Sequence, residues 1–443
     1  MAFHTHLAPD TLPGFRPVSR RYRWAIFAVL FALMVVDYVD RQVVVSMFSH
    51  LKVQWHLSDS RLGGLVSVVS VTVALGAVPV SLLADRWSRV KSIFLMALIW
   101  SLATTACAFA GSYAQLFAAR SVVGLGEAAY GTVGAALLAT VFPPRMRSTV
   151  LGAFLAASML GSVLGVVLGG VIAQHWGWQA GFGAVGLPGL LLAMVFLATA
   201  RDYRTVALPS AGAVRGRTRP RFSAIAAELL QPRSAPITCL GAGLQLLAVS
   251  TIYAWLPSYL NRSYGLAPDQ AGLRAGVVVL AGGIGAVFWS AVADRLSVRL
   301  PPARLYVPAF TAVLTATLIC PALALLSPGP VQYALLVAGG LVMAGTIGPA
   351  AAVVVDVTHP GLRATASAVL SLTQNLIGLA GGPLLTGFLS DRYGLQAAMA
   401  TAPLFCLVAA AMFVLAAKTY PTDLKRVPPA AAGFELGSRP QQA

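Results

Sequence analysis

The stretch SLLADRWS, residues 81–88, returns in closely related form as SAVADRLS at residues 290–297. Five of the eight positions are identical, and each copy follows an apolar run long enough to cross a membrane. The first copy follows the second such run of the chain, and the second copy follows the eighth. A weaker repeat places RST at 147–149 and RAT at 363–365, each opening the fifth run of its half. The sequence therefore predicts two halves of like topology with six transmembrane helices each.

The composition around this repeat is that of a membrane protein. Of 443 residues, 58% are hydrophobic and only 10% are charged, which excludes a soluble fold. Lipid offers the backbone no hydrogen-bond partner, so runs of this length must be helices. We expect an all-α membrane protein with twelve transmembrane helices in two six-helix bundles. The spans are placed at 24–48, 61–84, 92–111, 115–142, 148–173, 180–199, 236–260, 270–293, 304–327, 331–355, 364–390 and 395–417.

The longest polar segment divides these spans six and six. It predicts a cytoplasmic linker at 200–235 between an N-terminal bundle, 24–199, and a C-terminal bundle, 236–420, with cytoplasmic tails at 1–23 and 421–443. Of the 31 Lys and Arg residues, 24 fall in alternate segments, and Arg41 and Arg120 lie inside spans. The intervening segments hold only Lys52, Arg61, Arg262, Arg274 and Arg392.

This asymmetry explains the net charge of +17 without any nucleic acid. The positive-inside rule places both termini in the cytoplasm. Compact loops and a composition rich in Ala, Gly and Arg indicate a multi-pass protein of a bacterial inner membrane.

Several classes of function lack their sequence signals. The four cysteines stand singly in apolar segments, with no nearby histidine to complete a metal site. GxxxxGK[ST], HExxH and GxSxG are all absent, so we expect neither an enzyme nor a bound cofactor or metal. A secondary carrier acting as a monomer is the expected class. A ligand-gated channel is the alternative. Flux that saturates and shows counterflow would exclude it.

Charged residues inside the first and fourth spans carry the functional argument. Asp37, Asp40 and Arg41 are spaced i, i+3 and i+4, while Arg120 and Glu127 lie two turns apart. Each charge at mid-membrane costs about 2.5–3.5 kcal/mol, so the two sets are expected to meet and pair. Three acids and two bases leave one carboxylate over, which suits proton coupling. We expect Asp40 and Glu127 to compete for the two arginines; the alternative is a purely structural set of salt bridges.

The chain resembles the major facilitator superfamily over residues 20 to 420. A family motif, G-x-L-A-D-R-x-G-R-x-K, is matched at Asp85, Arg86, Arg89 and Lys91, with Ser81 and Ser88 in place of its glycines. R-x-x-x-G-x-G is present as Arg120, Gly124 and Gly126, and a glycine-rich fifth span as Gly161, Gly165, Gly169 and Gly170, without the usual Gly-Pro pair.

Within that superfamily, three stretches are similar to the Spinster lipid and lysolipid transporters. They are DYVDR at 37–41, RSVVGLGEAAY at 120–130 and RATASAVLSLTQNLIGLAGGP at 363–383. The resemblance implies a proton-coupled transporter of an amphiphile, such as a lysophospholipid or a sphingolipid-like molecule, working by alternating access. Organic-anion symporters of the same superfamily share the charged patterns of spans one and four, so a carrier of aromatic or sugar acids is the alternative.

The second half supplies the remaining candidates. Its spans hold no deep charge apart from Asp356 at an edge, so an apolar, aromatic wall is expected to face the charged one. The candidate substrate-binding residues are Tyr130, Gln245, Tyr253, Trp255, Gln374 and Asn375. The resemblance also implies a cytoplasmic latch between the bundles, formed by Asp85, Arg86 and Arg89 with Asp294 and Arg295.

Overall fold

The computed structural model describes residues 19–143, 146–201, 229, 231–359 and 362–426. Within these ranges, twelve helical segments are long and apolar enough to cross a membrane, which confirms the predicted number. Several segments lie outside the described residues. They are most of the predicted linker, the predicted tails up to residue 18 and beyond residue 426, and the short segments 144–145 and 360–361.

The N-terminal bundle comprises residues 20–199. Its helices are α1 (Arg20–Ser46), the short α2 (Phe48–Trp55), α3 (Asp59–Arg86), α4 (Arg89–Cys107), α5 (Tyr113–Glu127), α6 (Tyr130–Val141), α7 (Arg147–Trp176) and α8 (Trp178–Thr199). The fourth span is broken between α5 and α6, at Ala128 and Ala129, where the sequence predicted one continuous helix.

The C-terminal bundle repeats this plan. Its helices are α10 (Ser234–Tyr264), α11 (Pro268–Ser297), α12 (Ala303–Leu325), α13 (Pro330–Met343), α14 (Ile347–Asp356), α15 (Arg363–Thr373), α16 (Gly381–Tyr393), α17 (Leu395–Thr401) and α18 (Leu404–Arg426), with a π-helix, η3 (Gln374–Ala380), joining α15 to α16. Its fourth span is also broken, between α13 and α14. The last helix runs nine residues past its predicted end at 417.

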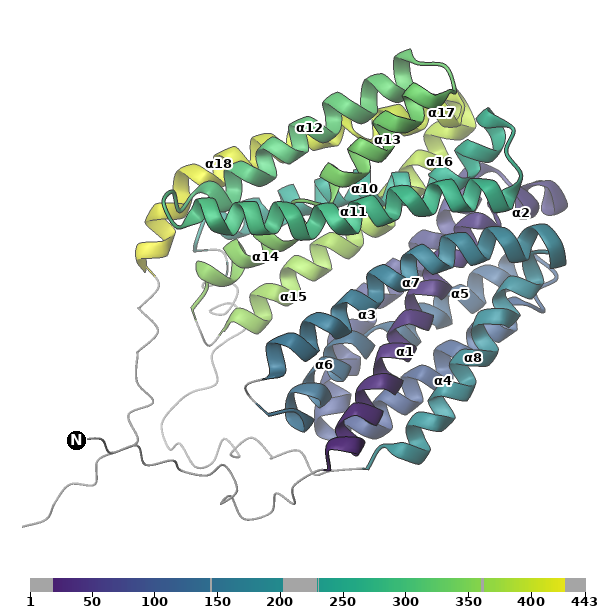
Figure 1. Ribbon diagram of the computed structural model, residues 1–443, viewed down its shortest axis with the longest axis horizontal. Coiled ribbons are helices and arrows are strands. Elements are labelled where there is room, and N and C mark those ends of the chain that lie inside the picture. The colour runs from purple at the N-terminus through teal and green to yellow at the C-terminus, as the bar shows by residue number, and fades with distance from the viewer. Residues whose placement is uncertain (1–18, 144–145, 202–228, 230, 360–361, 427–443) are drawn as a thin grey trace, which may run out of the picture.

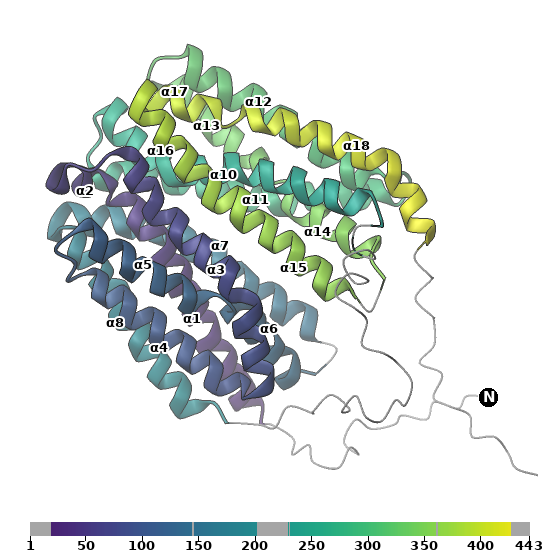
Figure 2. The same cartoon turned by 180° about the vertical axis from the view of Figure 1, so that it is seen from behind.

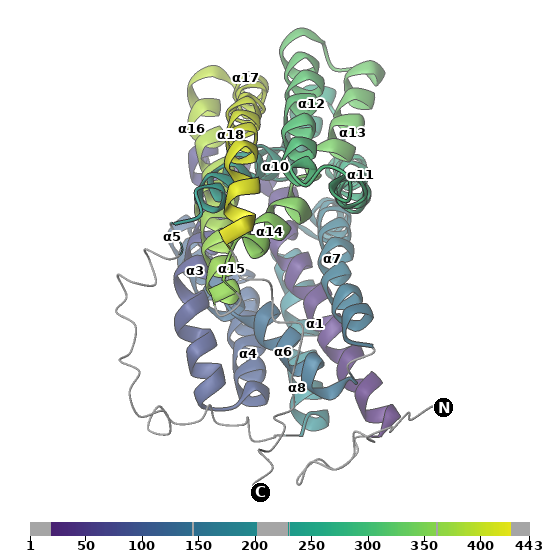
Figure 3. The same cartoon turned by 90° about the vertical axis from the view of Figure 1, so that its left-hand side faces the viewer.

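The two bundles meet along two helix pairs. Helix α7 lies beside α11 on one side of the molecule (Figure 1), and α3 lies beside α16 on the other (Figure 2). Figure 3 shows the N-terminal bundle below the C-terminal one. We call the end that contains Asp59 and Asp391 the joined end, and the end that contains Arg20 and Arg426 the terminal end.

The hydrophobic core shows how the bundles are joined. One buried cluster runs through both bundles toward the joined end, where the ring of Phe48 packs 5.1 Å from that of Trp255. Toward the terminal end the core divides into a cluster within the N-terminal bundle and another within the C-terminal bundle. Among the described residues, the buried apolar core therefore joins the bundles toward the joined end.

Glycines on α7 set the position of α1. A Cβ atom at Gly161 would lie 2.4 Å from the carbonyl oxygen of Val35, and one at Gly165 would lie 2.7 Å from that of Val39. These distances are too short for any side chain, so only glycine permits α7 to touch the α1 backbone. The contact fixes the part of α1 that carries the charged residues.

Candidate functional site

The five charged residues of spans one and four come together inside the N-terminal bundle. Asp40 Oδ2 lies 3.0 Å from a terminal nitrogen of Arg120, and Glu127 Oε2 lies 2.9 Å from one of Arg41. Asp37 Oδ2 lies 3.8 Å from Arg41 Nε, one helical turn away on α1. The partners named in the sequence hypothesis therefore meet, and the structure sorts them into two groups.

These two groups differ in their access to water. The side chains of Asp40 and Arg120 are each 1% exposed, so their pair is sealed between helices. Arg41 is 20% exposed, although Glu127 beside it is fully buried. Arg41 also lies 5.3 Å from the centre of the Tyr38 ring, within cation–π range. Arg41 is therefore the more accessible of the two arginines.

Glycines of the fourth span let α5 pack closely against α3 and α4. A Cβ atom at Gly124 would lie 2.5 Å from the carbonyl oxygen of Val69 on α3, and one at Gly126 would lie 2.7 Å from the amide nitrogen of Trp100 on α4. Helix α5 therefore fits closely between two neighbours. It ends at Glu127, where the span breaks, so the carboxylate sits at an interruption of the helix.

The charged group leaves hydrogen-bonding capacity unused. Asp37 Oδ1, Asp40 Oδ1 and Glu127 Oε1 are buried without a hydrogen-bond partner among the described residues. Asp37 also lies close enough to Glu127 for their carboxyl groups to interact. Two adjacent buried carboxylates repel each other when both are ionised, and a shared proton removes that repulsion. The arrangement suits a site that takes up and releases one proton.

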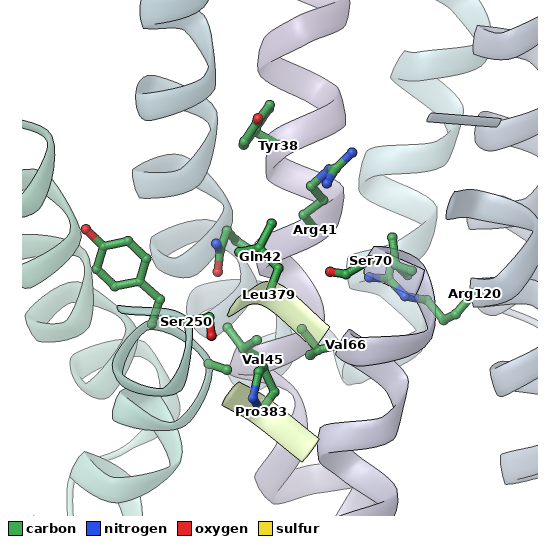
Figure 4. Close-up of a pocket in the computed structure, with 13 residues that line it drawn as sticks. Tyr38, Arg41, Gln42, Val45, Val66, Ser70, Arg120, Ser250, Leu379 and Pro383 are labelled. Atoms are coloured by element: carbon green, nitrogen blue, oxygen red, sulfur yellow. The ribbon is translucent and has the colours of Figure 1, made fainter. Parts of the chain in front are cut away.

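A cavity of about 110 Å³ lies beside Arg41, between the two bundles (Figure 4). The N-terminal bundle lines it with Tyr38, Arg41, Gln42, Val45, Val66, Val69, Ser70 and Arg120, and the C-terminal bundle with Ser250, Tyr253, Ala254, Leu379 and Pro383. The lining from the C-terminal bundle is uncharged, as the sequence predicted. The cavity therefore places a cationic side chain opposite an uncharged wall that includes an aromatic ring.

Of the predicted substrate-binding residues, Tyr253 alone lines this cavity. Tyr130 is fully buried, packs against Trp100 and donates a hydrogen bond of 2.8 Å to the carbonyl oxygen of Leu30. Gln245 is also fully buried and donates to the carbonyl oxygen of Met343 at 2.9 Å. Each side chain bonds to another helix of its own bundle and does not line this cavity, so a role at the substrate stays a prediction.

The other three predicted residues do not line the cavity. The buried indole of Trp255 donates a hydrogen bond of 3.1 Å to the carbonyl oxygen of Pro383, which fixes the cavity wall. Gln374 and Asn375 begin the π-helix η3, and Asn375 donates to the carbonyl oxygen of Ser371 at 2.9 Å. Short π-helices are frequent at functional sites.

The sequence hypothesis missed several cavity residues. Tyr38, Gln42 and Val45 follow, together with the predicted Arg41, the spacing i, i+3, i+4 and i+7, which places them on one face of α1. That periodicity could have identified them from the sequence. Ser250 had no such signal, because its role depends on how α10 packs against η3, where its hydroxyl donates to the carbonyl oxygen of Gly378 at 2.8 Å.

The predicted latch residues lie at the terminal end. Asp294 pairs with Arg304 of its own bundle at 3.3 Å, and Arg304 pairs in turn with Asp356. Arg295 is exposed and Arg89 begins α4, partly buried. The side chains of Asp85 and Arg86 lie outside what the structure describes. The latch role of this set stays a prediction, and Arg304, which the sequence did not identify, is a partner of Asp294 within the C-terminal bundle.

Comparison with known proteins places these features in a family context. A sequence profile described as Major Facilitator Superfamily matches residues 30–382 and, in a second match, residues 238–440. Spinster homolog 1 of Xenopus tropicalis is 28% identical over 400 residues, which cover 85% of this chain and 74% of that protein. The hexuronate transporter of Bacillus subtilis is 23% identical over 377 residues, covering 83% of this chain and 88% of that protein.

A solved structure shares the fold. The crystal structure of a bacterial homolog to the human lysosomal transporter Spinster, inward-facing and unoccupied, superposes with a TM-score of 0.83 at 22% sequence identity. The match covers 92% of this chain and 99% of that chain. The two-bundle architecture thus extends over nearly the whole of both proteins.

Proposed function

This chain belongs to the Major Facilitator Superfamily, and on that premise we propose that it is a proton-coupled secondary transporter of an amphiphilic anion. It is a multi-pass membrane protein and a transporter of the Spinster type, not an enzyme. One chain supplies both bundles around the cavity, so a monomer is sufficient for the proposed cycle.

The observation that carries the proposal is the pair formed by Arg41 and Glu127 at the edge of the cavity. Its nitrogen and oxygen lie 2.9 Å apart, and the arginine belongs both to the charged group and to the cavity lining. A proton on Glu127, or one shared with Asp37, weakens the hold of these carboxyl groups on Arg41. The guanidinium is then free to bind an anionic head group.

Proton binding and anion binding therefore favour each other at this site. An anion on Arg41 displaces the neighbouring carboxylates, and a displaced buried carboxylate takes up a proton because burial disfavours its charged form. This reciprocity is the thermodynamic requirement for coupling. It favours movement of proton and substrate in the same direction.

The architecture supports alternating access around this cavity. The shared core joins the bundles at one end, while separate cores serve them at the terminal end. With both termini in the cytoplasm, as the distribution of basic residues indicates, this arrangement corresponds to an inward-facing state. Transport would proceed by rocking the bundles about the cavity so that the joined end opens.

The cavity also bears on substrate class. A cavity of about 110 Å³ suits a head group, since pockets for whole drug-sized ligands measure about 300–1,000 Å³. A lysophospholipid or sphingolipid-like molecule would place its head group beside Arg41 and its tail between the bundles. The small volume and the similarity to a hexuronate transporter favour a second candidate, a symporter of small organic acids.

A reconstituted transport assay distinguishes these functions. Purified protein in liposomes with an inward proton gradient should accumulate a labelled lysophospholipid in a saturable manner, and collapse of the gradient should abolish accumulation. Accumulation of a hexuronate alone would favour the second candidate. Saturable flux of either substrate that is indifferent to the gradient would contradict proton coupling.

A further inference from the structure

A buried carboxylate at the joined end connects the two bundles. Asp59 begins α3 of the N-terminal bundle and is 2% exposed. Its Oδ1 lies 2.9 Å from one terminal nitrogen of Arg262, and its Oδ2 lies 2.8 Å from the other. Arg262 belongs to α10 of the C-terminal bundle. This two-pronged pairing is the strongest geometry available to an arginine and a carboxylate.

Two further groups complete the coordination of the same carboxylate. Ser390, on α16 of the C-terminal bundle, donates its hydroxyl to Asp59 Oδ2 at 2.5 Å. Lys52, on α2 of the N-terminal bundle, donates to Oδ1 at 2.6 Å. Both carboxylate oxygens thus accept bonds from the opposite bundle, and separating the bundles would leave Asp59 with Lys52 as its remaining partner in this set.

A second carboxylate makes the connection in the reverse direction. Asp391 on α16 accepts hydrogen bonds from the backbone N–H groups of Asp59 at 2.7 Å and Ser60 at 3.0 Å. These donors belong to the first turn of α3, where the helix dipole favours a negative charge. Asp391 therefore caps a helix of the other bundle. Gly387 allows this approach, because a Cβ atom there would lie 2.5 Å from the carbonyl oxygen of Asp59.

The joined end and the cavity share the same helices. Helix α3 carries Asp59 at its start and the cavity residues Val66 and Ser70 two to three turns further on. Between them, the hydroxyl of Ser67 donates to the carbonyl oxygen of Ala380 in η3 at 2.6 Å. Movement of α3 against η3 and α16 at the cavity is therefore transmitted to Asp59.

We propose that Asp59 is a state-selective lock, whose ion pair with Arg262 stabilises the conformation in which the joined end is closed and must break in each transport cycle. This inference rests on the proposed alternating-access function. The contacts exist only while the bundles are together, so they shift the equilibrium toward that state. Removing Arg262 leaves the buried carboxylate of Asp59 with Lys52 as its charged partner, which weakens the closed state.

The test measures the width of the joined end directly. Spin labels are attached at Val53 and Tyr393, which are 76% and 68% exposed and lie on opposite bundles, in full-length protein whose four native cysteines are replaced. Labelled protein that keeps Asp59 and Arg262 should give mainly one short distance between the two labels. Asp59→Asn and Arg262→Gln should each raise the ratio of a longer distance to the short one by about tenfold or more.

The double variant tests whether loss of the Asp59–Arg262 ion pair causes the change in distance. Because both substitutions remove one interaction, Asp59→Asn with Arg262→Gln should shift the ratio no further than the larger single effect. Full additivity, or an unchanged distance distribution in both single variants, would overturn the lock. Asp269→Asn is the matched control, since this carboxylate at the same end accepts a hydrogen bond from Gln270 of its own helix. It should leave the distribution unchanged.

Two features keep the test decisive. Should Asp59→Asn fail to fold, Ser390→Ala removes one hydrogen bond while keeping both charges, and a smaller shift in the same direction is expected. No shift with that variant in folded protein would count against the lock. The distance measurement uses neither substrate nor a proton gradient, so its outcome is independent of whether the proposed substrate and coupling are correct.

Discussion

Arg41 lies 2.9 Å from Glu127 and also lines the cavity between the bundles. Its side chain retains 20% exposure, whereas Glu127 is fully buried. Glu127 does not line the cavity, so it can influence the cavity only through its ion pair with Arg41. Proton binding at a buried acid can thereby alter how strongly an exposed arginine attracts a ligand.

We expect Glu127→Gln to remove the proton dependence of uptake. The amide cannot ionise, so Arg41 would be released from Glu127 at every pH, and substrate would bind without a proton on that residue. In liposomes, uptake driven by a pH gradient should fall at least tenfold while exchange of internal for external substrate continues. Asp269→Asn, an acid outside the charged group, is the control. Uptake by Glu127→Gln that still follows the gradient would contradict the coupling role.

Arg120→Ala should destabilise the protein more than Arg41→Ala does. Arg120 is 1% exposed, and its removal leaves Asp40 buried without its ion-pair partner, which costs about 3–5 kcal/mol. Arg41 is partly exposed, so water can enter the space left by its side chain. Thermal unfolding in detergent should show the larger decrease in Tm for Arg120→Ala. Equal decreases would indicate that the two pairs are sealed to the same degree.

The contrast between these arginines shows what the sequence could predict. Spacing along a helix is set by covalent geometry, so the shared faces of Asp37, Asp40 and Arg41 and of Arg120 and Glu127 could be deduced from residue numbers. Twelve spans followed from length and hydropathy for a similar reason, since a membrane demands about 20 apolar residues per helix. Exposure depends on neighbouring helices, and the sequence could not separate the sealed pair from the open one.

For a related reason, the sequence could not predict the contacts between the bundles. Asp59 and Arg262 are far apart in the chain, and each reads as an ordinary polar residue near the end of a span. Their pairing depends on how two rigid bundles dock. The same dependence explains Gln245, whose buried amide was expected at the substrate but instead bonds to the carbonyl oxygen of Met343 near a helix break. A buried amide needs a partner, and the sequence did not reveal which one.

Gly161→Ala should impair transport, while Gly152→Ala on the same helix should not. A methyl group at 161 would lie 2.4 Å from the Val35 carbonyl oxygen, so α7 must move away from α1 and displace the charged residues that follow Val35. At Gly152 an added methyl meets nothing within 4 Å. Uptake should decrease at least tenfold for the first variant. Comparable rates in the two variants would show that close contact between α1 and α7 is dispensable.

Tyr253 and Tyr130 provide a matched pair for testing the substrate site. Tyr253 lines the cavity, so Tyr253→Ala should raise the KM for substrate several-fold. Tyr130→Phe removes a buried hydrogen bond to Leu30 and should lower stability by about 1 kcal/mol, with KM unchanged. Uptake kinetics and thermal unfolding on both variants separate the two roles. If Tyr130→Phe raised KM while Tyr253→Ala did not, the substrate would have to contact the interior of the N-terminal bundle, and the cavity beside Arg41 would no longer qualify as its site.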